Sequence, residues 1–78
     1  MPRYFFHLHN DLETRDEEGL ELPDLAAARD VADHEARAMA AESVANGQLD
    51  LNHSIEVTDE SGATVLVVRF GEAVEIVR

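Results

Sequence analysis

The chain has no cysteine and no tryptophan, and it contains only 6 basic residues against 17 acidic ones. The absence of cysteine excludes disulfides, thiolate zinc sites and cysteine nucleophiles together. The net charge of −11 repels phosphate backbones and anionic lipids, so binding to nucleic acid or to a membrane is not expected. No stretch approaches the ~20 apolar residues that a membrane span needs, and the start of the chain lacks the apolar core of a signal peptide. We therefore expect a cytoplasmic protein.

The length of the chain sets a limit on its stability. With 78 residues, it forms a single domain over residues 1–78 and has no room for a second core. A domain of this size buries only about 60% of the surface of its unfolded chain. Apolar residues make up 45% of the sequence, but many of them are alanines, which bury little area each. Because disulfides are excluded, self-association is the expected source of additional stability.

The alanine-rich segment Asp24–Asn46 predicts one long helix. Pro23 and Asp24 indicate its start, because the aspartate side chain accepts hydrogen bonds from the first free N–H groups. Gly47 indicates its end, because glycine adopts the left-handed conformation without steric cost. Residues at spacings of three and four define the face expected to pack inward. They are Leu25, Ala28, Ala32, Ala36, Met39 and Ser43.

Short strands are predicted on both sides of this helix. In chain order they are Arg3–His9, Leu12–Arg15, Leu20–Leu22, His53–Asp59 and Thr64–Phe70. The last two form a hairpin around the turn Asp59–Gly62. Leu49 and Leu51, in the connection after the helix, are expected to lie under the helix end. In the segment Ala73–Val77, β-branched side chains favour a terminal strand over a single helical turn.

These elements predict an α+β fold in the order strand–strand–helix–strand–strand, with the terminal strand added. The strands form a small antiparallel sheet, and the long helix packs on one of its faces. The other face carries Phe5, His7, Val65 and Val67, which together are too apolar to remain in water. We therefore expect a homodimer that buries these residues, by packing sheet on sheet or by edge pairing through the last strand.

His7 and His9 are the most suggestive pair for metal chemistry. Residues two apart on a strand project from the same face, so both imidazoles could bind one metal ion, with Asp11 or His53 completing the site. The alternative is a hydrogen-bonded pair on a half-covered face or in a dimer contact, where histidines would gain charge near pH 6. Because this pair supplies only two nitrogen ligands, we assign no metal and no cofactor. His7 and His9 remain candidate metal ligands.

The other patterns do not indicate an enzyme. The acidic run Asp16–Asp24 lacks the spacing of a calcium loop, because Gly19 is its fourth residue and such a loop needs glycine at the sixth. The serines lack the strained turn of a hydrolase nucleophile, and the four glycines form no phosphate-binding loop. We therefore predict a non-enzymatic protein-interaction or regulatory accessory module. The alternatives are a metal- or pH-responsive sensor using His7 and His9, and an acidic decoy that binds a basic protein partner.

Three segments of the chain resemble a known family. They are the opening Met-Pro-Arg-Tyr-Phe-Phe-His-Leu of residues 1–8, the segment Asp16–Asp24 before the helix, and the segment Ile55–Gly62 before an apolar strand. Together they are similar to a family of small stand-alone bacterial proteins catalogued as a domain of unknown function. The resemblance covers nearly the whole chain. It implies a bacterial cytoplasmic protein with a one-domain fold, and it assigns no role to any residue.

Overall fold

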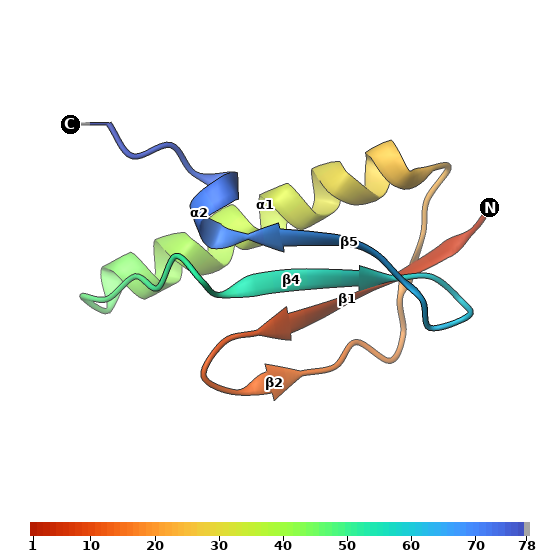
Figure 1. Ribbon diagram of the computed structural model, residues 1–78, viewed down its shortest axis with the longest axis horizontal. Helices are drawn as coiled ribbons and strands as arrows, with labels where there is room; N and C mark the ends of the chain where they lie inside the picture. Colours follow the sequence, from red (N-terminus) through yellow and green to blue (C-terminus); the bar gives the residue numbers. More distant parts are fainter. Residues whose placement is uncertain (78) are drawn as a thin grey trace.

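The computed structural model describes residues 1–77, which form a five-stranded antiparallel sheet and two helices (Figure 1). The elements are β1 (Arg3–His9), β2 (Glu13–Thr14), β3 (Leu20–Glu21), α1 (Leu25–Ala45), β4 (Ser54–Thr58), β5 (Thr64–Arg69) and α2 (Phe70–Ala73). The sheet order is β2-β1-β4-β5, and β3 pairs with the other end of β1. The predicted α+β fold is confirmed. Within residues 1–77, no helix is long and apolar enough to cross a membrane.

The long helix α1 begins and ends where the sequence indicates. The side chain of Asp24 accepts a hydrogen bond from the Ala27 N–H at 2.9 Å, and Gly47 adopts a φ of +86° after the last turn. The fully buried stripe consists of Ala28, Ala32, Ala36 and Ala40. Because these side chains are single methyl groups, α1 lies close against β4 and β5.

One member of the predicted inward face is placed differently. Leu25 is 44% exposed. It lies in the first turn of α1, which Figure 1 shows above β5 and outside the outline of the sheet. Ala40 takes part in the buried stripe instead.

The core lies between α1 and one face of the sheet. The strand register places Phe6 beside Val57 and Val57 beside Leu66, so alternate residues of three strands face the helix together. Ile55, Val57 and Val68 are at most 2% exposed. The alternation of faces thus holds along the regular parts of these strands. It breaks at Val65, which was expected on the open face but packs against the core where the register shifts.

The predicted terminal strand over Ala73–Val77 is wrong. Phe70–Ala73 forms the short helix α2, and the residues that follow are irregular. At the start of this helix the Glu72 carboxylate accepts a hydrogen bond from the Arg69 N–H at 3.2 Å, which satisfies a backbone donor at the helix N-terminus. Phe70 and Ala73 stand three residues apart, which is helical spacing, and both are buried on the side of α2 that packs against α1. These contacts outweigh the strand preference of the β-branched residues.

The connection between α1 and β4 also differs from the prediction. Leu49 and Leu51 are each 37% exposed, so neither lies under the helix end. The segment is held through its backbone instead. Gly71 N–H donates to the Leu51 carbonyl at 3.1 Å, and Phe70 N–H donates to the His53 carbonyl at 2.8 Å. These bonds place the connection beside α2.

Candidate functional site

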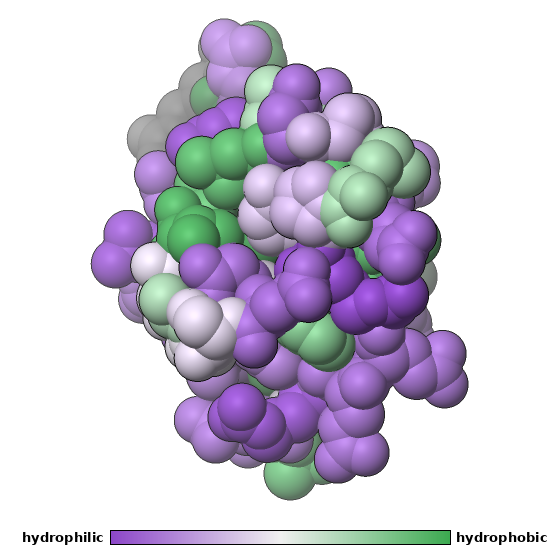
Figure 2. Space-filling model, turned by 90° about the vertical axis from the view of Figure 1, so that its right-hand side faces the viewer, coloured by the Kyte–Doolittle hydropathy of each residue, from purple (hydrophilic) through white to green (hydrophobic). Residues whose placement is uncertain are grey.

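The sheet face opposite α1 carries the residues predicted for an interface and for a metal. The register places His7 beside Glu56 and Glu56 beside Val67 on this face. Figure 1 shows the face toward the viewer, with α1 fainter behind it. In Figure 2, hydrophobic surface gathers on the left, which is the side of this open face, while most of the remaining surface in view is hydrophilic.

The four predicted interface residues differ in their exposure. Val67 is 41% exposed, Phe5 and Val65 are half-buried, and His7 is only 5% exposed. A single chain thus already removes His7 from water, and the apolar surface left open on this face centres on Val67. The assignment of these residues to a dimer interface stays a prediction.

His7 is held by hydrogen bonds at both ring nitrogens. Its Nε2 lies 3.0 Å from the Thr58 hydroxyl, and the Asp16 N–H donates to its Nδ1 at 3.0 Å. A backbone N–H can only donate, so Nδ1 carries no proton and Nε2 carries the proton that is shared with Thr58. This arrangement fixes a neutral imidazole in one tautomer. It leaves neither nitrogen free for a metal ion.

Asp16 organises the segment that covers His7. Its carboxylate accepts three backbone hydrogen bonds, from Phe6, Glu18 and Gly19, each at 3.1 Å. Partial burial alone would raise the pKa of Asp16. The N–H groups of Gly19, Phe6 and Glu18 outweigh burial and hold the pKa below its ordinary value. The turn at Asp16–Gly19 is therefore fixed to the edge of β1 through one ionised side chain.

His9 lies among carboxylates on the same face. Its Nε2 is 2.8 Å from Glu56 Oε1, and its Nδ1 is 3.4 Å from Glu13 Oε1. Glu56 also accepts a hydrogen bond from the Thr64 hydroxyl. The hydrogen bonds from Thr64 and His9 lower the pKa of Glu56, although partial burial opposes them. This cluster ties β1 to β4 and β5 across the open face.

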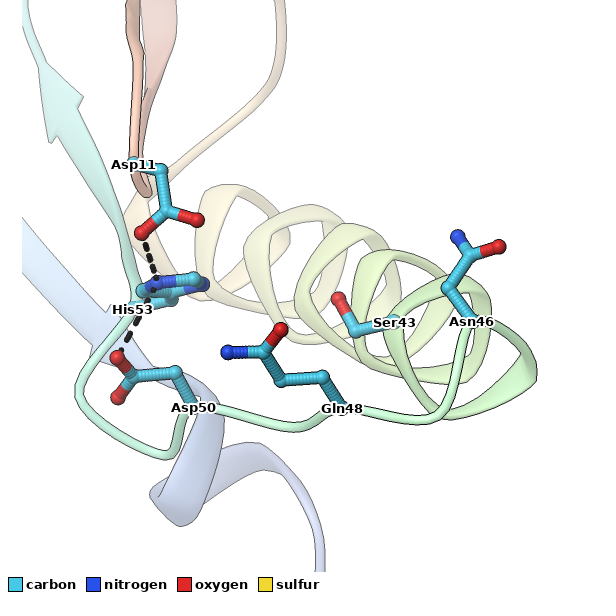
Figure 3. A pocket seen from close by; sticks show the side chains of 6 residues that line it. All are labelled: Asp11, Ser43, Asn46, Gln48, Asp50 and His53. Carbon is cyan, nitrogen blue, oxygen red and sulfur yellow. Dashed lines mark ion pairs between the residues drawn. The ribbon is translucent and has the colours of Figure 1, made fainter.

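The structure separates the residues of the metal hypothesis. His7 and His9 share the open face, whereas Asp11 and His53 meet in a separate pocket (Figure 3). Among residues 1–77, no group of three or more His, Cys, Asp or Glu side chains is placed to hold a metal ion.

The pocket around His53 has a volume of about 140 Å³ and lies at the C-terminal end of α1. In Figure 3, Asp11 and Asp50 flank His53, with carboxylate oxygens 3.5 and 3.4 Å from its Nε2. The imidazole packs edge-on against Phe70, with ring centroids 5.7 Å apart. Ser43, Asn46 and Gln48 complete the lining. Typical ligand pockets begin at ~300 Å³, so this one has room only for a small chemical group.

Sequence reasoning missed the pairing of Asp50 with His53. The pairing could have been found from the spacing of three residues between Asp50 and His53 across a turn. The Asp50 side chain accepts a hydrogen bond from the Asn52 N–H at 2.9 Å within this turn. Asp11 is distant in sequence and comes to the same place only through the pairing of β1 with β4.

The fold and this surface define a small α+β domain with one helix-covered sheet face and one open, hydrogen-bonded face. The chain belongs to DUF6894, a domain of unknown function, whose family pattern matches residues 3–71. The predicted resemblance to a family of unknown function is thus confirmed. No curated protein and no solved structure matches the chain.

Proposed function

We propose that this protein is a non-enzymatic protein-interaction or regulatory accessory module that works as a homodimer. The observation that carries the proposal is the open sheet face, where Val67 is 41% exposed and Phe5, on the far side of β4, is half-buried. Exposed apolar residues that lie together on a sheet face are typical of contact surfaces. The pocket at His53 supports binding of a small group at most, which favours an interaction role over a catalytic one.

The charge of the chain suggests the chemistry of a second partner. A net charge of −11 favours a basic protein, because complementary charge accelerates and orients association. Affinity capture from a lysate at low and high salt tests this expectation with the protein immobilised. Basic proteins that are captured at low salt and released at high salt support it, whereas capture that is unchanged by salt contradicts an electrostatic mechanism.

The homodimer is tested by the particle mass in solution. Light scattering after size exclusion, over a dilution series, is expected to give about twice the 8.6 kDa of one chain. The variant Val67→Lys is expected to lower the particle mass toward that of a monomer, because it places a charge on the exposed apolar face. The matched control is Leu12→Lys, since Leu12 is 77% exposed and lies in the β1–β2 turn. A wild-type monomer at every concentration contradicts the homodimer.

A pH-responsive role for His7 is the second candidate. The neutral ring accepts the Asp16 N–H at 3.0 Å, so adding a proton to Nδ1 replaces an acceptor with a donor and breaks this bond. Asp16, Glu56 and His9 are the other titratable groups near His7. Nitrogen NMR of the imidazole should find the proton on Nε2 at pH 7. On acidification, the Asp16 amide signal should shift together with the ring signal. An Asp16 amide signal that stays unchanged while the His7 ring signal shifts contradicts this role.

A further inference from the structure

The outer edge of β5 is the longest unpaired strand edge of the sheet. β5 is the last strand in the order β2-β1-β4-β5, so residues 1–77 supply no strand on its far side. The opposite edge is different, because there β1 is covered by β2 and β3, two strands of two residues each. An edge of six residues presents unpaired N–H and C=O groups that can accept another strand.

The hydrogen-bond alternation identifies which backbone groups of β5 are free. Phe70 N–H donates to the His53 carbonyl at 2.8 Å, which marks this position as a hydrogen-bonded pair with β4. In an antiparallel ladder such pairs recur every second residue. Leu66 and Val68, which lie beside Val57 and Ile55, therefore also direct their N–H and C=O groups toward β4. The N–H and C=O of Val67 point away from the sheet.

Two features restrict the usable edge to the middle of the strand. At its beginning, the register shifts between Val57 and Thr58, and the irregularity falls at Val65. At its end, the Arg69 N–H already donates to the Glu72 carboxylate at 3.2 Å, and α2 follows at once. Val67 is thus the centre of the regular, unpaired part of β5.

We propose that two copies of this chain pair antiparallel along β5, with the two-fold axis at Val67. The proposal rests on the proposed homodimer and names its contact. It places Val67 opposite Val67 of the second copy, and Leu66 opposite Val68 of the second copy. The two sheets join into one continuous sheet through main-chain hydrogen bonds. The Val67 side chain, 41% exposed in one chain, is covered by its own counterpart, as a two-fold contact requires.

The distribution of charge favours a second copy as the occupant of this edge. Residues 63–71 contain no acidic residue, although the chain has 17 acidic residues among 78. Two strongly acidic molecules repel one another, and contact along an acid-free strand keeps their carboxylates apart. A basic partner would find no opposite charge at this edge, because the charged residue of β5 is Arg69, which is itself basic. The edge and the acidic surface are therefore suited to different partners.

A single introduced cysteine tests the pairing directly, because the chain has none of its own. Opposite residues of a hydrogen-bonded antiparallel pair have Cα atoms about 5.5 Å apart, within the roughly 4.4–6.8 Å that a disulfide spans. Under mild oxidation, Val67→Cys is expected to form a disulfide-linked dimer on a non-reducing gel. Arg69→Cys is the control on the same strand. In this register its counterpart lies four residues away along the partner strand, at about 13 Å, so it stays unlinked.

The mass measurement on the wild type separates the two proposals. A wild-type dimer in which Val67→Cys cross-links and Arg69→Cys does not supports pairing along β5. A wild-type dimer with Val67→Cys unlinked overturns edge pairing and leaves the homodimer standing through the open face. A wild-type monomer with no cross-link overturns both. Circular dichroism of each variant, with a spectrum matching the wild type, shows that the result reports on association and not on unfolding.

Discussion

Removing the carboxylate of Asp16 tests whether one side chain fixes the segment between β2 and β3 to the sheet. Three backbone N–H groups donate to it, those of Phe6, Glu18 and Gly19. Phe6 pairs with β4 on one side, but its N–H lies on the other edge of β1, between the pairings with β3 and with β2, where no strand covers it. In the variant Asp16→Ala this part-buried N–H loses its acceptor.

The size of the effect follows from these bonds. A hydrogen bond to a charged acceptor contributes about 1.5–3 kcal/mol, and a buried donor left without a partner costs a similar amount. The Glu18 N–H is exposed and can turn to water at little cost. We therefore expect Asp16→Ala to lower the free energy of unfolding by about 2–3 kcal/mol at pH 7. For a domain of this size, that corresponds to a fall in Tm of about 10–20 °C.

The pH dependence gives a second, independent check. The pKa of Asp16 is lowered in the folded state, so its carboxylate stabilises the fold fully above the unfolded value of about 3.9. This contribution fades as the pH falls through the lower, folded value. The stability difference between wild type and Asp16→Ala should thus be constant near neutral pH and shrink below about pH 4.

Urea unfolding followed by far-UV circular dichroism, between pH 7 and pH 3, measures both effects. Glu17→Ala is the matched control, because Glu17 is the exposed neighbour and its loss should change stability by less than about 0.5 kcal/mol. The reasoning is refuted if Asp16→Ala costs no more than this control. It is also refuted if the difference from wild type widens on acidification.

Two packing predictions use the same measurement. Gly19→Ala is expected to destabilise more than Gly62→Ala. Both glycines have positive φ, but a Cβ at Gly19 meets atoms including the Tyr4 carbonyl at 2.9 Å, whereas a Cβ at Gly62 meets nothing within 4 Å. Gly62→Ala should cost about 1–2 kcal/mol for backbone conformation alone, and equal losses would contradict a steric role at Gly19. Ala36→Leu is expected to cost about 1–3 kcal/mol by overpacking, since Ala36 is fully buried; a cost no larger than that of the exposed Ala38→Leu would refute close packing of α1.

The helix and the main strands could be predicted because their signals are local. Asp24 caps α1 with its own side chain, and Gly47 ends it through its own backbone conformation. The alternation within Arg3–His9 already separates the helix-facing residues from the open face. Each of these signals lies within one turn or one strand, so the sequence alone contains it.

The features that escaped prediction depend on contacts between distant segments. The short helix α2 replaces a strand because Phe70 and Ala73 bury themselves beside α1. His7 was expected on an open face, yet it is covered because Asp16, nine residues later, donates to its ring. The pocket at His53 exists because Asp11 and Asp50 reach it from opposite sides. These contacts join residues that are far apart in the sequence, so no periodic pattern of residues predicts them.

The core of one chain is thin because it contains few large apolar side chains. The stripe of α1 that packs on the sheet is made of alanines, and the largest fully buried side chains are Phe70, Val57 and Val68. Such a core contributes little hydrophobic free energy for its length. The fold therefore depends on charged hydrogen bonds such as those of Asp16. Association of folded chains stabilises them by mass action, so the proposed pairing of two copies along β5 would supply stability that the core of one copy lacks.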